Sequence, residues 1–155
     1  MLISLLRKYW SSMKNNFEFV ELSNGSLSDQ DLFRLISMAR ESEEGVYRFN
    51  LHKSLEDKLQ EMLICFFNRS QSNVHKHLDK DEVITLIDGI VEVQIFDEEF
   101  NELESQKLTK SGLHSFIRIE EGCWHKVNII SEYAIIHEIT TGPFDKTKMI
   151  RKPNE

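Results

Sequence analysis

The sequence has 155 residues and a formal net charge of −7, from 26 acidic and 19 basic side chains. This length suits one domain, and a hydrophobic share of 40% is enough for a packed core, which excludes disorder over the whole chain. The acidic balance argues against nucleic acid as a partner, because affinity for phosphate backbones comes from a clustered positive surface. Two cysteines cannot build a disulfide framework, so we expect a reduced, cytoplasmic setting.

The N-terminal region carries no signal for a membrane. No apolar run in the sequence reaches the roughly 20 residues that a membrane-spanning helix needs. The short apolar stretch over residues 2–6 meets Arg7 and Lys8 without a basic region before it, which is not typical of a signal peptide. We therefore expect residues 1–25 to form an N-terminal extension.

The first half of the chain has helical apolar spacing and predicts a helical arm over residues 26–67. Ser28 is followed three residues later by Asp31, the arrangement of a capping box, and apolar side chains then recur at intervals of three and four residues. These signals predict a helix over about residues 29–42. A second serine–aspartate pair opens the same spacing over residues 55–66, which predicts a second helix.

After residue 70 the apolar period shortens toward two, which is typical of strands. The predicted strands cover residues 83–87, 90–97, 103–108, 115–120, 126–130 and 133–140. Asp88 and Gly89 lie between two apolar runs and predict a two-residue hairpin turn. Six short strands without helices between them indicate an antiparallel sandwich or barrel over residues 68–145, followed by a tail over 146–155.

Three histidines and one glutamate form the most specific pattern in the chain. His75 and His77 project from one face of an extended segment, and Glu82 opens the next predicted strand. The turn at Gly122 presents His125 from a distant strand. A single strand histidine is usually a core or surface residue, but three imidazoles and a carboxylate that converge inside a barrel are ligands for a divalent metal ion. A barrel without metal, in which the imidazoles act as acid–base groups, is the alternative.

At these positions the sequence resembles the cupin superfamily. Residues 75–89 fit the metal-ligand part of its first motif, G-x5-H-x-H-x3–4-E-x6-G, and the segment from Gly112 to His125 matches the second motif, with Glu120 in place of the usual proline. The resemblance implies a mainly β fold, the cupin double-stranded β-helix or jelly-roll barrel, preceded by a short N-terminal α-helical arm. It also implies one divalent transition metal ion, with iron, zinc, nickel, cobalt and manganese all compatible with imidazole ligands.

A narrower resemblance, to the WbuC-like cupin metalloproteins, covers about residues 45–145. The segment from Arg48 to His52 matches an R-x-N-x-H stretch, Gly122 to His125 matches G-x-W-H, and Gly142 with Pro143 and Phe144 follows the last strand where that family has Gly-Pro-Tyr. This resemblance implies a sugar or sugar-nucleotide ligand and a role in bacterial surface-polysaccharide (O-antigen) biosynthesis.

Further polar residues are candidates for catalysis or substrate binding beside the metal. The resemblance points Glu138 into the cavity and leaves the adjacent His137 outside, so Glu138 is the candidate catalytic acid or base; a carboxylate hydrogen-bonded at the barrel rim is the alternative. Arg48, Asn50 and His52 alternate along one face of an extended segment. They suit a substrate rim, or equally an arm held to the barrel by side-chain hydrogen bonds.

Trp124 and Cys123 precede the last predicted ligand. Trp124 suits stacking on a sugar ring, which makes it a candidate substrate-binding residue, or covering the flank of the barrel. Cys123 is better explained as a small residue that fills a turn than as a reactive thiol.

Two kinds of function fit these patterns. An enzyme would use open coordination positions of the metal to polarise a carbonyl or to activate oxygen, as an isomerase, epimerase or oxygenase. A non-catalytic module would bind a sugar or small acid, with a metal that orients the ligand or stabilises the fold. Exposed barrel edges and an N-terminal arm also favour a homodimer.

Overall fold

The computed structural model describes residues 16–22, 25–70, 72–112 and 114–153. Within these ranges the chain forms one α-helix, one 3-10 helix and eleven strands. In chain order the elements are β1 (Phe17–Phe19), α2 (Asp29–Glu41), β2 (Val46–Asn50), β3 (Leu59–Phe67), β4 (His75–His77), β5 (Glu82–Asp88), β6 (Ile90–Phe96), β7 (Glu102–Thr109), β8 (Phe116–Ile119), β9 (Trp124–Ile129), β10 (Tyr133–Thr141), η1 (Lys146–Lys148) and β11 (Met149–Arg151).

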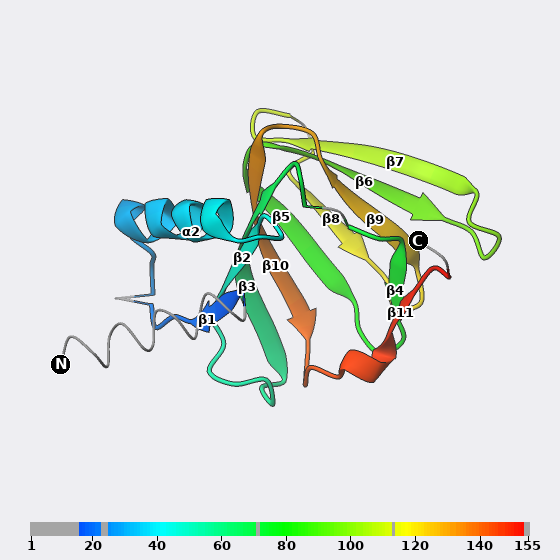
Figure 1. Ribbon diagram of the computed structural model, residues 1–155. Coiled ribbons are helices and arrows are strands. Elements are labelled where there is room, and N and C mark those ends of the chain that lie inside the picture. The colour runs from blue at the N-terminus through cyan, green and yellow to red at the C-terminus, as the bar shows by residue number, and fades with distance from the viewer. Residues whose placement is uncertain (1–15, 23–24, 71, 113, 154–155) are drawn as a thin grey trace.

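The strands form two sheets that face each other (Figure 1). The six-stranded sheet has the order β1-β2-β3-β10-β5-β8, and the five-stranded sheet has the order β11-β4-β9-β6-β7. All neighbouring strands pair antiparallel except β1 and β2. The prediction of a mainly β, antiparallel jelly-roll barrel preceded by a helix is therefore confirmed.

The first predicted helix is confirmed as α2. The Ser28 side chain accepts a hydrogen bond from the Asp31 backbone N–H, and the Asp31 side chain accepts one from the Ser28 backbone N–H, so both groups of the capping box are present. The helix buries Leu35, Met38 and Ala39 against the outer face of the six-stranded sheet. This packing fixes the helix beside β2 and β3.

The second predicted helix is wrong, because residues 59–67 form strand β3. This strand pairs with β2 on one side and β10 on the other. Its side chains point alternately into two cores. Ile64 lies in the core between the two sheets, and Leu63 and Cys65 lie in the core under α2. A strand buried on both faces is apolar at most positions, and such a run also satisfies helical spacing.

The predicted hairpin at Asp88 and Gly89 is also wrong, because these residues carry the chain from one sheet to the other. β5 pairs with β10 and β8, whereas β6 pairs with β7 and β9. Gly89 has a φ of 89°, and a Cβ placed on it would lie 2.4 Å from the backbone oxygen of Tyr133. The crossing therefore requires glycine for both its backbone conformation and its close approach to β10.

The main hydrophobic core lies between the two sheets. Its buried members are Val46, Ile64, Ile84, Leu86, Val91, Val93, Leu108, Ile119, Ala134 and Ile136. These inward-facing side chains come from both sheets, so the core joins them and holds the strands that carry the candidate ligands.

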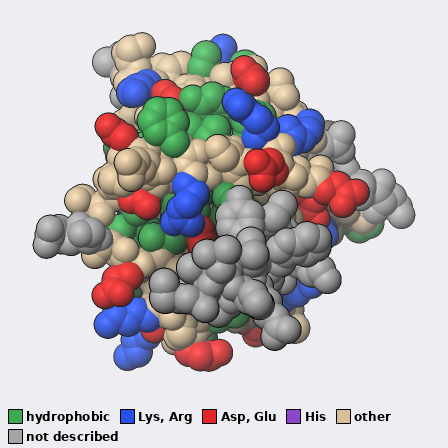
Figure 2. Space-filling model, turned by 60° about the vertical axis from the view of Figure 1, so that its left-hand side comes forward, with side chains coloured by type: hydrophobic (Ala, Val, Ile, Leu, Met, Phe, Trp, Pro, Cys, Tyr) green, Lys and Arg blue, Asp and Glu red, His purple; other side chains and the backbone are tan. Residues whose placement is uncertain are grey.

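The ends of the chain extend the two sheets. The predicted N-terminal extension, residues 1–25, lies mostly outside the described residues, but β1 within it pairs with β2. The predicted tail contains β11, which pairs with β4. No helix among the described residues is long and apolar enough to cross a membrane. Figure 2 shows basic and acidic side chains mixed over one face of the molecule.

Candidate metal centre

The structure brings the four predicted ligands together at one end of the barrel. His75 and His77 lie on β4 and His125 lies on the neighbouring β9, with the Cα atoms of His75 and His125 in register. Glu82 opens β5 in the opposite sheet. One potential ligand atom from each of these residues lies within 4.8 Å of all the others. The cluster therefore joins the two sheets.

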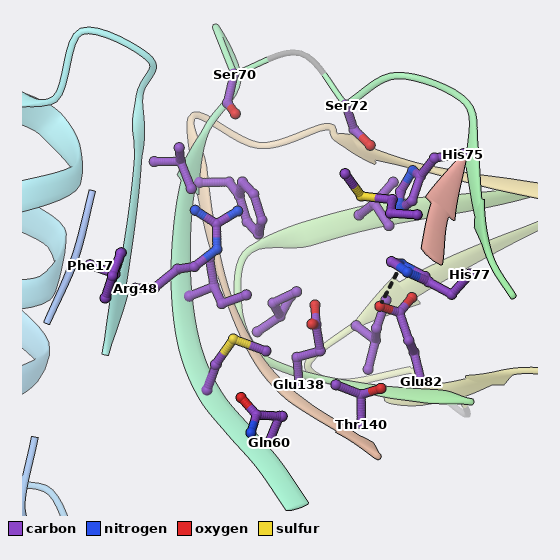
Figure 3. A pocket seen from close by; sticks show the side chains of 18 of the residues that line it. Phe17, Arg48, Gln60, Ser70, Ser72, His75, His77, Glu82, Glu138 and Thr140 are labelled. Carbon is purple, nitrogen blue, oxygen red and sulfur yellow. Dashed lines mark ion pairs between the residues drawn. The ribbon is translucent and has the colours of Figure 1, made fainter. Parts of the chain in front are cut away.

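The glutamate is the centre of the contacts within this cluster. Glu82 Oε1 lies 3.1 Å from His77 Nε2, and Glu82 Oε2 lies 3.2 Å from His125 Nε2 (Figure 3 shows the His77 contact). The centroids of the His75 and His125 rings are 4.2 Å apart. Glu82 and His125 are buried, while His75 and His77 are half-buried.

Backbone carbonyls fix the tautomer of two imidazoles. The His75 Nδ1 lies 2.9 Å from the Asn73 carbonyl oxygen, and the His125 Nδ1 lies 3.0 Å from the Cys123 carbonyl oxygen. A carbonyl oxygen only accepts, so each Nδ1 carries the proton and donates it. This leaves Nε2 as the ring atom that faces the cluster, which is the arrangement found around metal-bound histidines.

The environment keeps His75 neutral and Glu82 ionised. Burial and the nearby His125 lower the pKa of His75 to about 4. Burial opposes ionisation of Glu82, but the hydrogen bonds with His125 and His77 outweigh it, so the pKa of Glu82 lies well below its usual range. A neutral imidazole and a carboxylate are the protonation states that metal binding requires. The donor set therefore suits a divalent metal ion.

A cavity of about 760 Å³ lies beside the cluster, and all four residues line it (Figure 3). Much of its wall is apolar and comes from Met62, Ile64, Phe66, Val127, Ile129 and Ile136. A volume of this size holds a ligand as large as a small sugar derivative.

Glu138 on β10 points into this cavity (Figure 3). The adjacent His137 does not line it. The Glu138 backbone is aligned with Ile84 on β5, two residues beyond Glu82. Burial and the Glu82 carboxylate raise the pKa of Glu138 to about 7, although the Arg48 guanidinium acts against this shift. The His137 Nε2 lies 2.8 Å from Glu61 Oε1 on the outer side of the sheet. Glu138 thus lies on the cavity side of β10, while its catalytic role stays a prediction.

Arg48, Asn50 and His52 also line the cavity. They belong to the six-stranded sheet or follow it directly, since β2 ends at Asn50. The His52 Nδ1 lies 2.9 Å from the Glu61 carbonyl oxygen, which ties its ring to β3. These residues are thus part of the barrel wall rather than of a separate helical arm.

Trp124 does not line the cavity. Its indole Nε1 donates a hydrogen bond to Glu98 at 3.0 Å, the Phe100 ring lies 4.9 Å from its own ring, and the Lys76 ammonium lies 4.5 Å above it. Adjacent strand residues face opposite sides, so placing His125 inward turns Trp124 outward. The placement agrees with the alternative that Trp124 covers the barrel flank. The neighbouring Cys123 packs at the edge of the main core, and burial raises the pKa of its thiol.

Sequence reasoning missed three buried polar residues in the cavity wall: Gln60, Lys80 and Thr140. Gln60 Nε2 donates to the Asp57 carbonyl oxygen at 2.8 Å, and Thr140 Oγ1 donates to the Asp81 carbonyl oxygen at 2.8 Å, so both hold nearby loops. The alternation along β3 could have revealed Gln60 once that segment was read as a strand. Lys80 is set in an otherwise acidic stretch, which was its only signal.

Solved structures with similar folds include protein SO0799 from Shewanella oneidensis and KdgF from Halomonas sp. The first has 12% sequence identity and a TM-score of 0.60, over 81% of this chain and 85% of that chain. The second has 15% identity and a TM-score of 0.53, over 69% of this chain and 88% of that chain. At this level of identity the likeness establishes the fold.

Oxalate decarboxylase from Bacillus subtilis is another structural neighbour, with 14% identity, a TM-score of 0.52 and coverage of 68% of this chain. The match covers 27% of that enzyme's chain, so this protein spans about a quarter of its length. These neighbours have the cupin fold, which confirms the cupin architecture of the two sheets.

No protein with a curated description matches this chain. The chain does match a family model. The model matches residues 27–108, from just before α2 through β7, and so covers more than half of the chain. This protein therefore belongs to the family described as a domain of unknown function, DUF6016.

Proposed function

We propose that this protein is a metal-dependent cupin enzyme, of the WbuC-like type, that isomerises or epimerises a sugar or sugar nucleotide in the biosynthesis of bacterial surface polysaccharide. One observation carries the proposal: three histidines and Glu82 from two sheets have converging ligand atoms beside a cavity. His75, His77, Glu82 and His125 hold the metal ion. A divalent ion bound there supplies Lewis-acid polarisation of a substrate carbonyl.

Glu138 is the group that moves the proton in this proposal. Its carboxyl lies in the cavity wall beside the ligands, and its pKa of about 7 suits both uptake and release of a proton near neutral pH. Isomerisation and epimerisation next to a carbonyl both need such a group.

Elemental analysis and turnover assays on the purified protein test this function. We expect about one divalent metal ion per chain in the natural protein and almost none in His77→Ala. We also expect turnover of a sugar nucleotide, detected as a new isomer by NMR over a panel of such compounds, to disappear in His77→Ala. A protein that contains no metal as purified contradicts the proposal. Sugar binding without turnover, unchanged after metal removal, identifies the non-catalytic module instead.

We further propose that the protein acts as a homodimer. The edge strands β7 and β8 expose Leu103 and Phe116, at 66% and 61% of their surface. Large exposed apolar side chains on sheet edges are typical of interaction surfaces. Light scattering during size-exclusion chromatography should give twice the chain mass of 18.3 kDa, and a monomer mass would contradict the dimer.

A further inference from the structure

Polar side chains extend from the metal centre across the inner face of the six-stranded sheet. Glu82 on β5 is aligned with Thr140 on β10. Glu138, two residues earlier on β10, is aligned with Met62 on β3, which in turn is aligned with Asn50 on β2. Since neighbouring strands lie about 4.8 Å apart, these groups cover roughly 14 Å between β5 and β2. A ligand at the metal centre can therefore also reach β2.

Lys80 is a cation of this cavity whose ammonium has no carboxylate in direct contact with it. The residue follows β4 and precedes β5 in the chain. It is only 6% exposed and lines the cavity. Its ammonium lies 5.4 Å from the centroid of the Phe144 ring. Among the residues that the structure describes, no hydrogen bond or ion pair to Lys80 is formed, although Lys80 interacts electrostatically with Glu138 and Asp145. A buried ammonium without a partner costs free energy, so the fold alone does not account for it.

Arg48 is a second cation in the same wall. Its guanidinium points into the cavity and lies 5.8 Å from the centroid of the Phe66 ring (Figure 3). It forms no hydrogen bond or ion pair with other described residues, although it interacts electrostatically with Glu138 and Glu44. A guanidinium with its donors unused matches the planar, two-oxygen shape of a carboxylate or phosphate.

The charges in the cavity leave an excess of positive charge beyond the metal cluster. Besides Glu82, the half-buried Glu138 is the only carboxyl in the described cavity wall that is not exposed, and it interacts with two cations, Arg48 and Lys80. The charged residues at the exposed mouth balance one another, two acidic against two basic: Glu43, Glu44, Arg69 and Arg151.

Two uncharged groups near these cations are also without partners. Asn50 Oδ1 and His52 Nε2 are buried and form no hydrogen bond, and both residues are at least nine-tenths buried in the cavity wall. Buried polar atoms in folded proteins almost always have a partner. These two atoms are therefore available to hydrogen-bond to a polar ligand in this part of the cavity.

We propose that the cavity binds a small organic anion with a carboxylate or phosphate group, that Lys80 and Arg48 recognise the anionic oxygens, and that Asn50 and His52 hydrogen-bond to its uncharged polar groups. This inference rests on the proposed function, because it takes the cavity as the substrate site of the metal centre. It narrows the substrate from sugars in general to those that carry an anionic group.

Calorimetric titration of the full chain as purified tests the preference for an anion. Glucuronate and glucose 1-phosphate are compared with glucose, which has the same ring without the anionic group. We expect at least one of the two anions to bind tenfold or more tightly than glucose. Comparison of the affinities for glucuronate and glucose 1-phosphate then shows whether the site prefers a carboxylate or a phosphate. Equal affinities for all three compounds, or no binding of either anion, overturn the inference.

Three variants assign the preference to the named side chains. Lys80→Met and Arg48→Met each remove one charge and should weaken binding of the preferred anion by tenfold or more. Lys110→Met removes an exposed lysine that lies 3.6 Å from Asp88, away from the cavity, and should change the affinity less than twofold. Unchanged affinity in Lys80→Met overturns its role in recognition.

Thermal unfolding and elemental analysis separate a ligand role from a structural one. Without added anion, the Tm of Lys80→Met should equal or exceed that of the natural protein, because the variant no longer buries an unpaired charge; a fall of several degrees would assign Lys80 to the fold. A sample that contains metal but shows no anion preference overturns this inference and leaves the metal enzyme standing. Anion binding that depends on Lys80 in a sample without metal supports the inference and contradicts the proposed function.

Discussion

Two carboxyl groups of the cavity have opposite protonation behaviour although they are close together. Glu82 receives hydrogen bonds from two imidazoles and stays ionised, while Glu138 has burial and the charge of Glu82 acting against its ionisation. This difference fits the proposed role of Glu82 as a metal ligand and of Glu138 as the group that exchanges a proton near neutral pH.

The raised pKa of Glu138 makes stability depend on pH. Its ordinary value is 4.5 and its folded value is about 7, so the folded protein binds a proton that the unfolded chain has already released. The resulting stabilisation is complete below pH 4.5 and is lost as the pH rises through 7. Glutamine cannot lose this proton. We therefore expect the Tm of metal-depleted Glu138→Gln, relative to the natural protein, to increase by several degrees between pH 5 and pH 8.

A matched control for this experiment is Glu104→Gln, which changes an exposed carboxylate on β7. Its Tm difference from the natural protein should stay nearly constant over the same pH range. If the Tm difference for Glu138→Gln is equally constant, then Glu138 is ionised throughout and does not exchange a proton near neutral pH.

At the residue level, the sequence predicts the metal cluster better than the rest of the cavity. His75 and His77 are two residues apart on one strand, so local spacing alone places them on the same face. Lys80 lies in the short loop between His77 and Glu82, where the alternation of a strand does not apply. No local pattern tells which way a loop side chain points, so this buried cation could not be recognised before the fold was known.

At the level of elements, central strands are the hardest to predict from the sequence. β3 has a core on each face, between the sheets and under α2, and its near-continuous apolar run fits a helix as well as a strand. The strands from β5 to β10 were predicted to within a few residues because most have one polar face. The turn at Gly89 was found, but a turn signal does not tell which partner each flanking strand will choose.

α2 should be an integral part of the folded domain, because its apolar face closes a core against β2 and β3. Leu35 is fully buried there. We expect Leu35→Ala to lower the free energy of unfolding by about 2–5 kcal/mol, from lost burial and a residual cavity. Chemical denaturation measures this change. The transition should remain a single step.

Phe33 on the same helix provides the control. Its side chain is 70% exposed, so Phe33→Ala should change the free energy of unfolding by less than about 0.5 kcal/mol. Equal effects of the two substitutions, or a separate transition for the helix, would mean that α2 does not fold together with the barrel.

At the level of the whole molecule, the proposed metal ion connects the two sheets. Three ligands come from β4 and β9 of the five-stranded sheet, and the fourth comes from β5 of the six-stranded sheet. The main core joins the sheets elsewhere, but the cavity occupies part of the space between them. An ion at this end therefore stabilises the barrel where side-chain packing is incomplete.

Metal removal should consequently lower the stability of the entire barrel. An ion that binds only the folded state adds about 2.7 kcal/mol when it is present at 100 times its Kd, and each kcal/mol shifts the Tm of a domain of this size by about 3 °C. We expect chelation by EDTA to lower the Tm by several degrees, as measured by calorimetry, and addition of the metal to restore it. His77→Ala should have the low Tm from the start and show no response to EDTA, because its ligand set is incomplete. His114→Ala, which removes an exposed histidine outside the cluster, should respond to EDTA like the natural protein. A Tm that stays constant while the measured metal content falls to zero would show that the ion does not tie the sheets together.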